Sequence, residues 1–285
     1  MKNKNLSILG IVVLTLLSFR SMAQQLKTPA PSPTQTLKQN FALGDITIEY
    51  SRPSVKGRVV FGDLVPYDKL WRTGANASTK ITFSDKVKLE GTDVPAGTYS
   101  LYTIPGKTEW TIILNKNTTL WGTDGYKQEE DIARFKVKSM TMNDKVETFT
   151  INVADVTAAS ANVDIIWEKT RVVFNIASNI DSVMMKNIET ALSPADKRPY
   201  YQAANYYFEN GKDLNKALEW VNKAIEQNPK AFYMVHLKAK IQMKLKDYKS
   251  AIASAEQSIA LAKDAKNDDY VKLNEKLIEE AKKAK

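Results

Sequence analysis

The first half of the chain alternates apolar and polar residues with a period of two. Ile46, Ile48 and Tyr50 fall on one face of an extended segment, with Thr47 and Glu49 on the other. The same alternation recurs in eight further segments: residues 80–83, 86–89, 99–101, 110–114, 134–138, 149–153, 163–167 and 172–176. Short alternating segments separated by Gly and Pro turns, without helices between them, are typical of antiparallel sandwiches or barrels. We therefore expect about nine strands in an antiparallel, sandwich-like β domain.

The second half changes to a helical period of 3.6 and contains a repeat. Shifting the chain by 34 residues superimposes small and apolar positions: Ala217 on Ala251, Val221 on Ala255, Ala224 on Ser258 and Ile225 on Ile259. A 34-residue helix–turn–helix period is that of tetratricopeptide repeats. The first copy has Gly211 in its turn, where the second has Lys246. A helix over 181–192 precedes the repeats, and a polar one over 267–284 follows them as a cap.

Composition changes at the junction between the two halves. Nine of the eleven glycines lie between Gly44 and Gly125, whereas alanine is concentrated after residue 176. Glycine turns suit strands, and alanine suits closely packed helices. The sequence thus predicts an α+β multidomain protein, with an antiparallel β domain over 37–177 and an all-α, tetratricopeptide-like domain over 178–285.

Residues 1–23 have the features of a secretory signal peptide. Lys2 and Lys4 precede a fourteen-residue apolar run over 6–19, and Ser21-Met22-Ala23 supplies a small-x-small cleavage pattern. The competing interpretation is a membrane anchor, but the run is short against the ~20 residues that a spanning helix needs. We expect cleavage after Ala23, a periplasmic or secreted location without stable membrane insertion, and a Pro-rich linker over 24–36.

The residue counts exclude several kinds of chemistry. The 285 residues contain no Cys and one His, so disulfides, Cys-ligated metals and sites built from several imidazoles are excluded. The net charge of +9 becomes +6 without the signal peptide and is spread over both halves, which argues against nucleic acid as a partner. We expect no metal site and no cofactor. His236 lies inside a predicted helix and suits packing better than catalysis.

Five motifs carry a resemblance to a known family. They are Ser51-Arg52-Pro53-Ser54-Val55-Lys56-Gly57-Arg58, Leu64-Val65-Pro66-Tyr67, Leu70-Trp71-Arg72-Thr73-Gly74-Ala75-Asn76, Pro95-Ala96-Gly97-Thr98-Tyr99-Ser100-Leu101 and Trp110-Thr111-Ile112-Ile113-Leu114-Asn115. Over roughly residues 37–175 they resemble domain-of-unknown-function family 2911, an exported bacterial family, and the Trp-Arg-Thr-Gly-Ala-Asn run is the most specific of them. The resemblance implies a β domain followed by tetratricopeptide-like helices and an envelope location. It implies no activity.

The loops of the β domain hold the main candidate binding residues. They are Arg52, Lys56, Arg58, Trp71, Arg72, Asn76 and Thr79. Arg and Asn side chains make directional hydrogen bonds to carboxylates, phosphates or sugar hydroxyls, and a Trp ring offers a stacking face. The structural alternative is that these side chains bind loop carbonyls and that the Trp fills the core. A second candidate is an aromatic platform for sugars, formed by Trp121 and Tyr126 in a Gly-containing loop.

The favoured function is that of an exported, non-enzymatic binding or scaffold protein of the bacterial envelope. The β domain would take a small anionic or sugar ligand, and the helical repeats would contact a protein or peptide. Lysines gather around the second repeat, where they would attract an acidic partner or simply form a solvated face: Lys238, Lys240, Lys244, Lys246 and Lys249. The alternative function is a hydrolase acting on a sugar or envelope polymer through carboxylates that the sequence does not identify.

Overall fold

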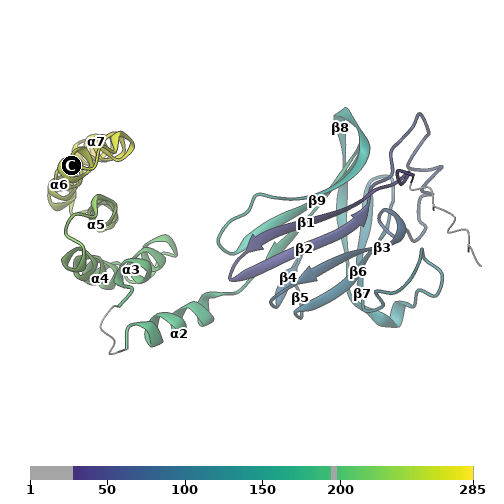
Figure 1. Ribbon diagram of the computed structural model, residues 1–285, viewed down its shortest axis with the longest axis horizontal. Helices are drawn as coiled ribbons and strands as arrows, with labels where there is room; N and C mark the ends of the chain where they lie inside the picture. Colours follow the sequence, from purple (N-terminus) through teal and green to yellow (C-terminus); the bar gives the residue numbers. More distant parts are fainter. Residues whose placement is uncertain (1–27, 194–197, 285) are drawn as a thin grey trace, which may run out of the picture. The chain divides into compact units, whose positions relative to one another are not determined.

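The computed structural model describes residues 28–193 and 198–284, so the predicted signal peptide and the first residues of the predicted linker lie outside the described part. The chain divides into two compact units, with the boundary between Asn179 and Ile180. The first unit is formed by strands and the second by helices (Figure 1).

An antiparallel sheet of nine strands makes up the described part of the first unit, which we call the β unit. The strands are β1 (Thr34–Phe41), β2 (Gly44–Ser51), β3 (Ala75–Phe83), β4 (Val87–Leu89), β5 (Thr92–Val94), β6 (Gly97–Ile104), β7 (Glu109–Asn115), β8 (Asp131–Ala154) and β9 (Ser160–Ala177). Their order across the sheet is β1-β2-β3-β6-β7-β8-β9-β4-β5. A single 3-10 turn, Gln128–Glu130, precedes β8.

Strand β8 joins the two layers of the β unit (Figure 1). Its first part, residues 131–138, pairs with β7, and its second part pairs with β9 from Ser139 to Ala154. The two layers face each other, since the hydroxyl of Tyr50 on β2 donates to the carbonyl of Ile151 and accepts from its amide, at 3.1 and 2.9 Å. The unit is therefore a sandwich in which one long strand passes from layer to layer.

The predicted alternation gives the buried faces of the strands. Ile46, Ile48 and Tyr50 on β2 are all buried. So are the apolar positions of the two longest strands: Phe149, Ile151, Val153, Val163, Ile165, Trp167, Val172, Phe174 and Ile176. Because side chains of a strand point alternately to opposite faces, one apolar face per strand suffices to build this single core.

Four strands differ from the sequence-based expectation: β1, β5, β8 and β9. β1 begins at Thr34, inside the predicted linker, and pairs with β2 over its whole length. The segments predicted at 134–138 and 149–153 belong to one strand, β8, and those at 163–167 and 172–176 to β9. The three-residue strand β5 was not expected. The described chain has nine strands, the number expected, because two strands were missed and two pairs of expected strands are each a single strand.

Six helices form the described part of the second unit, the helical unit (Figure 1). They are α2 (Asp181–Ala191), α3 (Tyr200–Glu209), α4 (Leu214–Gln227), α5 (Phe232–Lys244), α6 (Tyr248–Asp264) and α7 (Asp268–Lys283). Asp213, Asp247 and Asn267 cap α4, α6 and α7 by accepting hydrogen bonds from first-turn amides. No helix of the described chain is long and apolar enough to cross a lipid bilayer.

The 34-residue repeat falls on two successive helix pairs, α3–α4 and α5–α6. Its corresponding small residues are fully buried in both copies, as Ala217 and Ala251 illustrate. The two turns also match in backbone conformation, with φ of +62° at Gly211 and +63° at Lys246. The second copy therefore keeps a left-handed turn residue even though it lacks the glycine that adopts this conformation without strain.

Candidate functional site

The arginines at the start of the predicted binding cluster bind backbone and hydroxyl oxygens of the β unit. Arg52 donates from Nε to the carbonyl of Phe149 and from Nη2 to Thr150 Oγ1, at 3.0 and 2.9 Å. Arg58 donates to the carbonyls of Val55 and Ser54, at 3.0 and 2.7 Å. Both guanidinium groups thus hold an irregular loop in place, which fits the structural alternative.

Trp71 and Thr79 also have internal partners. The Trp71 ring lies among four aromatic rings, those of Phe61, Trp110, Phe149 and Trp167, with centroid distances from 5.2 to 6.1 Å. Its Nε1 donates to the carbonyl of Gly74 at 3.0 Å. Thr79 is fully buried, and its hydroxyl donates to the carbonyl of Thr73 at 2.6 Å. Trp71 is therefore partly buried and packs its ring against the core of the sandwich, which fits the structural alternative.

The remaining residues of the cluster, Lys56, Arg72 and Asn76, differ in their exposure and in their hydrogen-bond partners. Lys56 has an exposed side chain and a φ of +50°, and its amide donates to Glu147 Oε1 at 2.8 Å. Arg72 is half-buried beside Gly122, and its Nε has no hydrogen-bond partner among the described residues. Asn76 donates from Nδ2 to the carbonyl of Ser32 and to Ser51 Oγ, at 3.3 and 3.2 Å.

Asn76 and Trp121 meet at a small cleft of about 180 Å³ on the surface of the β unit. We call it the Trp121 cleft. Its polar residues come from three strands, β1, β2 and β3: Thr34, Glu49, Ser51, Asn76 and Ser78. Trp121 itself is 71% exposed, the most exposed of the large apolar side chains in the described chain. An exposed indole beside hydroxyl, amide and carboxylate groups is the arrangement that a polar ligand with an apolar face requires.

The loop that carries Trp121 is fixed at several points. Trp121 forms a backbone bridge with Ala77, and the amide of Ser78 donates to the carbonyl of Leu120 at 3.3 Å. Earlier in the loop, Ser100 Oγ donates to the carbonyl of Asn117 at 2.7 Å. After the ring, the Tyr102 hydroxyl donates to the carbonyl of Gly122 at 3.4 Å. Because the backbone is held on both sides of Trp121, little order has to be gained when a ligand binds.

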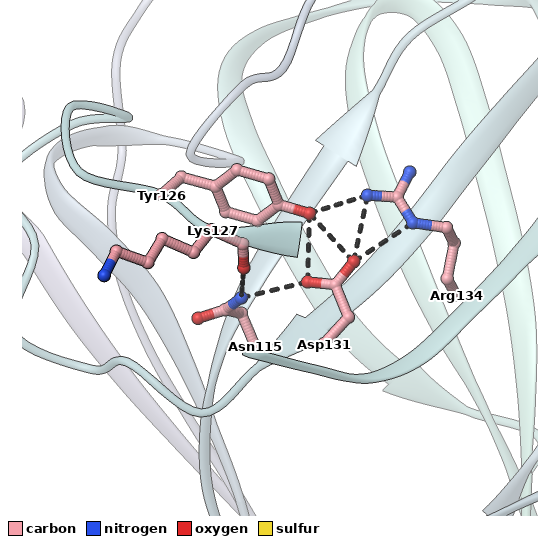
Figure 2. A network of polar contacts seen from close by, with 5 residues as sticks. All are labelled: Asn115, Tyr126, Lys127, Asp131 and Arg134. Atoms are coloured by element: carbon pink, nitrogen blue, oxygen red, sulfur yellow. Dashed lines mark hydrogen bonds and ion pairs between the residues drawn. The ribbon is translucent and has the colours of Figure 1, made fainter. Parts of the chain in front are cut away.

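A network of polar side chains fixes the far end of the same loop (Figure 2). Asn115 donates from Nδ2 to the carbonyl of Lys127 and to Asp131 Oδ1, both at 2.9 Å. The Tyr126 hydroxyl lies 2.8 and 2.9 Å from the two oxygens of the Asp131 carboxylate. Arg134 donates from Nε to Asp131 and from Nη2 to the Tyr126 oxygen, at 3.0 and 2.6 Å. The four side chains tie the loop to β7 and β8.

Tyr126 therefore supports the loop and does not share an open platform with Trp121. Its ring packs edge-on against buried Tyr102, with centroids 5.3 Å apart. Burial and the Asp131 carboxylate raise the pKa of Tyr126 to about 12. The hydroxyl stays protonated at neutral pH and continues to donate to Asp131.

Two carboxylates of the β unit form ion pairs with arginines, whereas Glu130 has a buried Oε2 with no hydrogen-bond partner among the described residues. Asp131 pairs with Arg134, and Asp164 with Arg171, at 2.9 and 2.7 Å. In the helical unit, burial lowers the pKa of His236, whose Nδ1 lies 2.8 Å from Asn274 Oδ1. No group of three or more His, Asp or Glu residues in the described chain is placed to hold a metal ion.

Most cleft residues were missed by the sequence analysis. Thr34, Glu49, Ser51 and Ser78 lie on three strands, and only pairing in the sheet brings them beside Asn76. A local signal exists at Thr73, whose φ of +54° is costly for a β-branched residue and marks a constrained loop. This φ value is known only from the structure, so the sequence alone could not have revealed it.

Comparison with known proteins gives one result. No curated protein and no solved structure matches the chain significantly. A family model described as a protein of unknown function, DUF2911, matches residues 32–176, which cover nearly all of the β unit described above and the whole Trp121 cleft. The matched segment is slightly more than half of the chain, and the protein therefore belongs to the DUF2911 family.

Proposed function

We propose that this protein is an exported, non-enzymatic binding protein of the bacterial envelope, whose β unit binds a carbohydrate at the Trp121 cleft. The observation that carries the proposal is the 71% exposure of Trp121 on a loop with fixed ends. Exposing an indole to water costs free energy that burial would recover, at roughly 25 cal/mol per Å². A ring held in that position by surrounding hydrogen bonds is suited to cover the apolar face of a ligand.

The chemistry around the ring favours a sugar. A pyranose has an apolar face of C–H groups that stacks on an indole and a rim of hydroxyls that both donate and accept. The cleft offers the Glu49 carboxylate and the Asn76 amide, with the hydroxyls of Ser51 and Ser78 below. The described side chains around the cleft include one carboxylate and no basic group, which favours a neutral polyol over an anion.

Titration of the full chain with envelope glycan fragments and neutral oligosaccharides tests the proposal. Isothermal titration calorimetry reports binding without depending on Trp121, and Trp121→Ala is expected to weaken binding about tenfold or more, as for a central aromatic contact. Leu43→Ala is the matched control, because Leu43 is also exposed but lies at the turn of the β1–β2 hairpin, away from the cleft. Equal affinity in the parent and Trp121→Ala would overturn the site.

The same titration separates binding from hydrolysis. A binding protein returns the oligosaccharide intact after long incubation, whereas the hydrolase alternative shortens it. The described structure offers this alternative no specific support, because a single carboxylate, that of Glu49, lines the Trp121 cleft. A glycosidase of the usual kind needs two carboxyl groups across one bond.

Export is supported by the pattern of residues 1–23. Cell fractionation followed by N-terminal sequencing tests it, and the mature protein is expected to begin at Gln24 in the periplasm or medium. A chain that keeps Met1 in the cytoplasm would contradict the proposal.

The helical unit is proposed to be tetratricopeptide-like and to contact another protein. Its support is the 34-residue repeat on two helix pairs and the buried small residues, such as Ala217 and Ala251, that let the helices approach. Lys240, one of the lysines of the second repeat, pairs with Glu209 at 3.1 Å and lies over the Phe208 ring, so this side chain has a role within the unit. Cross-linking in cells, with and without residues 180–285, tests for a partner.

A further inference from the structure

A larger cavity lies within the helical unit, between α2, α3 and α4. It has a volume of about 690 Å³, within the ~300–1,000 Å³ typical of sites for small molecules. We call it the α2 groove. It belongs to the helical unit alone and has no residue in common with the Trp121 cleft.

The floor of the α2 groove is apolar and aromatic. Ile188, Tyr207 and Trp220 line it and are each less than 9% exposed. The Tyr207 and Trp220 rings pack edge to face, with centroids 4.6 Å apart. All three belong to the buried cluster of the helical unit, so the floor offers a packed surface to an apolar or aromatic group.

The rim of the α2 groove is basic. Four cationic side chains line it, Lys186, Arg198, Lys216 and Lys223, against one carboxylate, Glu189. Within the described chain only Lys223 of these four has an ion pair, with Glu219 outside the groove. Lys216 lies 5.2 Å from the centroid of the Trp220 ring, so positive charge stands directly beside the aromatic floor.

Helix α2, which forms one wall of the groove, is less deeply buried than α3 and α4. It buries a single residue, Ile188, whereas α3 and α4 each bury four. The α2 side chains Met184 and Met185 are only partly buried against the same cluster, and the groove beside them is open to solvent. An occupant of the groove would supply contacts that α2 lacks.

We propose that the α2 groove binds a small amphipathic anion, that is, a carboxylate or phosphate attached to an apolar body. The apolar body would lie on Tyr207 and Trp220, and the anionic group would face Lys186, Arg198 and Lys216. This site is independent of carbohydrate binding in the β unit, and either proposal can fail without the other.

The test uses two fluorescent probes of similar shape on the full chain. 8-Anilinonaphthalene-1-sulfonate is an aromatic anion, and N-phenyl-1-naphthylamine is its neutral analogue. The double variant Lys186→Gln/Lys216→Gln removes two exposed rim charges, and Lys263→Gln/Lys276→Gln removes two exposed charges on α6 and α7. We expect the rim variant to bind the anionic probe about three- to tenfold more weakly, and the control variant to change it less than about twofold.

The neutral probe checks that the floor survives, and its affinity should be unchanged in both variants. Loss of both probes in the rim variant shows damage to the floor, and Lys186→Gln alone then serves as the rim variant. Energy transfer from tryptophan to the bound probe is a second readout, because Trp220 is the only tryptophan after residue 179. Trp220→Phe should reduce this transfer if the probe is bound on Trp220. Equal loss of anion affinity in the rim and control variants, or no loss in either, would overturn the proposal.

Competition identifies the class of occupant. Decanoate is expected to displace the anionic probe at concentrations where decanol does not. Displacement by an acidic peptide but not by decanoate would overturn the assignment to a small ligand, since the groove would then be part of a protein interface.

Discussion

Trp71 and Trp121 are two tryptophans of the same unit with opposite expected roles, and replacing each by alanine distinguishes them. Trp71 lies among four aromatic rings, of which the nearest, Phe149, is 5.2 Å away between centroids. It also donates from Nε1 to the carbonyl of Gly74. Trp121 is 71% exposed. Trp71→Ala should therefore destabilise the β unit strongly, and Trp121→Ala hardly at all.

The expected magnitudes follow from burial. Trp71 is partly buried against the core, and truncating such a Trp to Ala costs about 3–5 kcal/mol at most, which includes the cavity left among the rings. For a unit of this size, each kcal/mol shifts Tm by about 2–4 °C, so Trp71→Ala should lower Tm by roughly 6–20 °C. An exposed substitution changes stability by only about 0.5 kcal/mol, so Trp121→Ala should shift Tm by less than about 2 °C.

Tryptophan emission during thermal unfolding is a suitable assay, because four of the five tryptophans lie in the β unit. Trp71→Phe is the intermediate variant, which keeps a ring but loses the hydrogen bond and should cost about 1–2 kcal/mol. Equal Tm shifts for Trp71→Ala and Trp121→Ala would refute the core role of Trp71. Unchanged Tm for Trp71→Ala with lost glycan affinity would restore it as a binding residue.

Three further predictions concern single side chains. Burial lowers the pKa of His236, so the unfolded chain takes up the proton first, and the helical unit should lose stability as pH falls below 6.5; urea midpoints of the parent should show this, and those of His236→Gln should not. Tyr126→Phe removes the hydroxyl beside Asp131 and should cost about 1 kcal/mol while speeding hydrogen exchange of residues 116–127, and unchanged exchange would contradict its role in fixing the loop. Lys246→Gly should raise the stability of the helical unit by about 1 kcal/mol in urea unfolding, because its φ is +63°, and a loss would show that the Lys side chain outweighs the strain.

Periodic burial is the part of the fold that the sequence predicts well. Ile46, Ile48 and Tyr50 are buried as expected because one face of β2 contacts the core. β1 was missed because Thr34–Phe41 is almost entirely polar, and only its last residue, Phe41, is buried. Its stability comes from backbone pairing with β2 along the edge of the sheet, and backbone pairing leaves no trace in side-chain pattern.

The two long strands were divided for a similar reason. Between Thr141 and Val146 the pairing of β8 with β9 is irregular, and most of the residues from 139 to 148 are exposed. On the partner strand, Glu168 has a φ of +55°. In the sequence, a run of exposed polar residues looks like a turn. In the structure, β8 continues through this run, and its pairing with β9 resumes after an irregularity in register.

The candidate site was predicted only in part because its polar groups depend on tertiary partners. An Arg in a loop has the same sequence signature whether it meets a carbonyl, as Arg58 does at Val55, or a ligand. The distinction is made by where the loop backbone runs, which a single sequence does not give. Trp121 was a candidate because its neighbours, Gly122 and Gly125, indicated a loop, and both have left-handed φ.

The backbone of residues 73–76, which leads into the cleft, adopts a conformation that costs free energy. Thr73 and Asn76 both have positive φ, at +54° and +60°, and such strain costs about 1–3 kcal/mol for a residue like Thr. The surroundings enforce it: Thr73 donates to Thr103 Oγ1 at 3.1 Å, and a Cβ at Gly74 would approach the Ser51 carbonyl at 3.0 Å. One consequence of this conformation is that Asn76 lies in the cleft, beside Trp121. The most specific motif of the family, residues 71–76, thus contributes a core tryptophan at one end and a cleft residue at the other, so that the stability of the sandwich and the geometry of the proposed binding site depend on the same six residues.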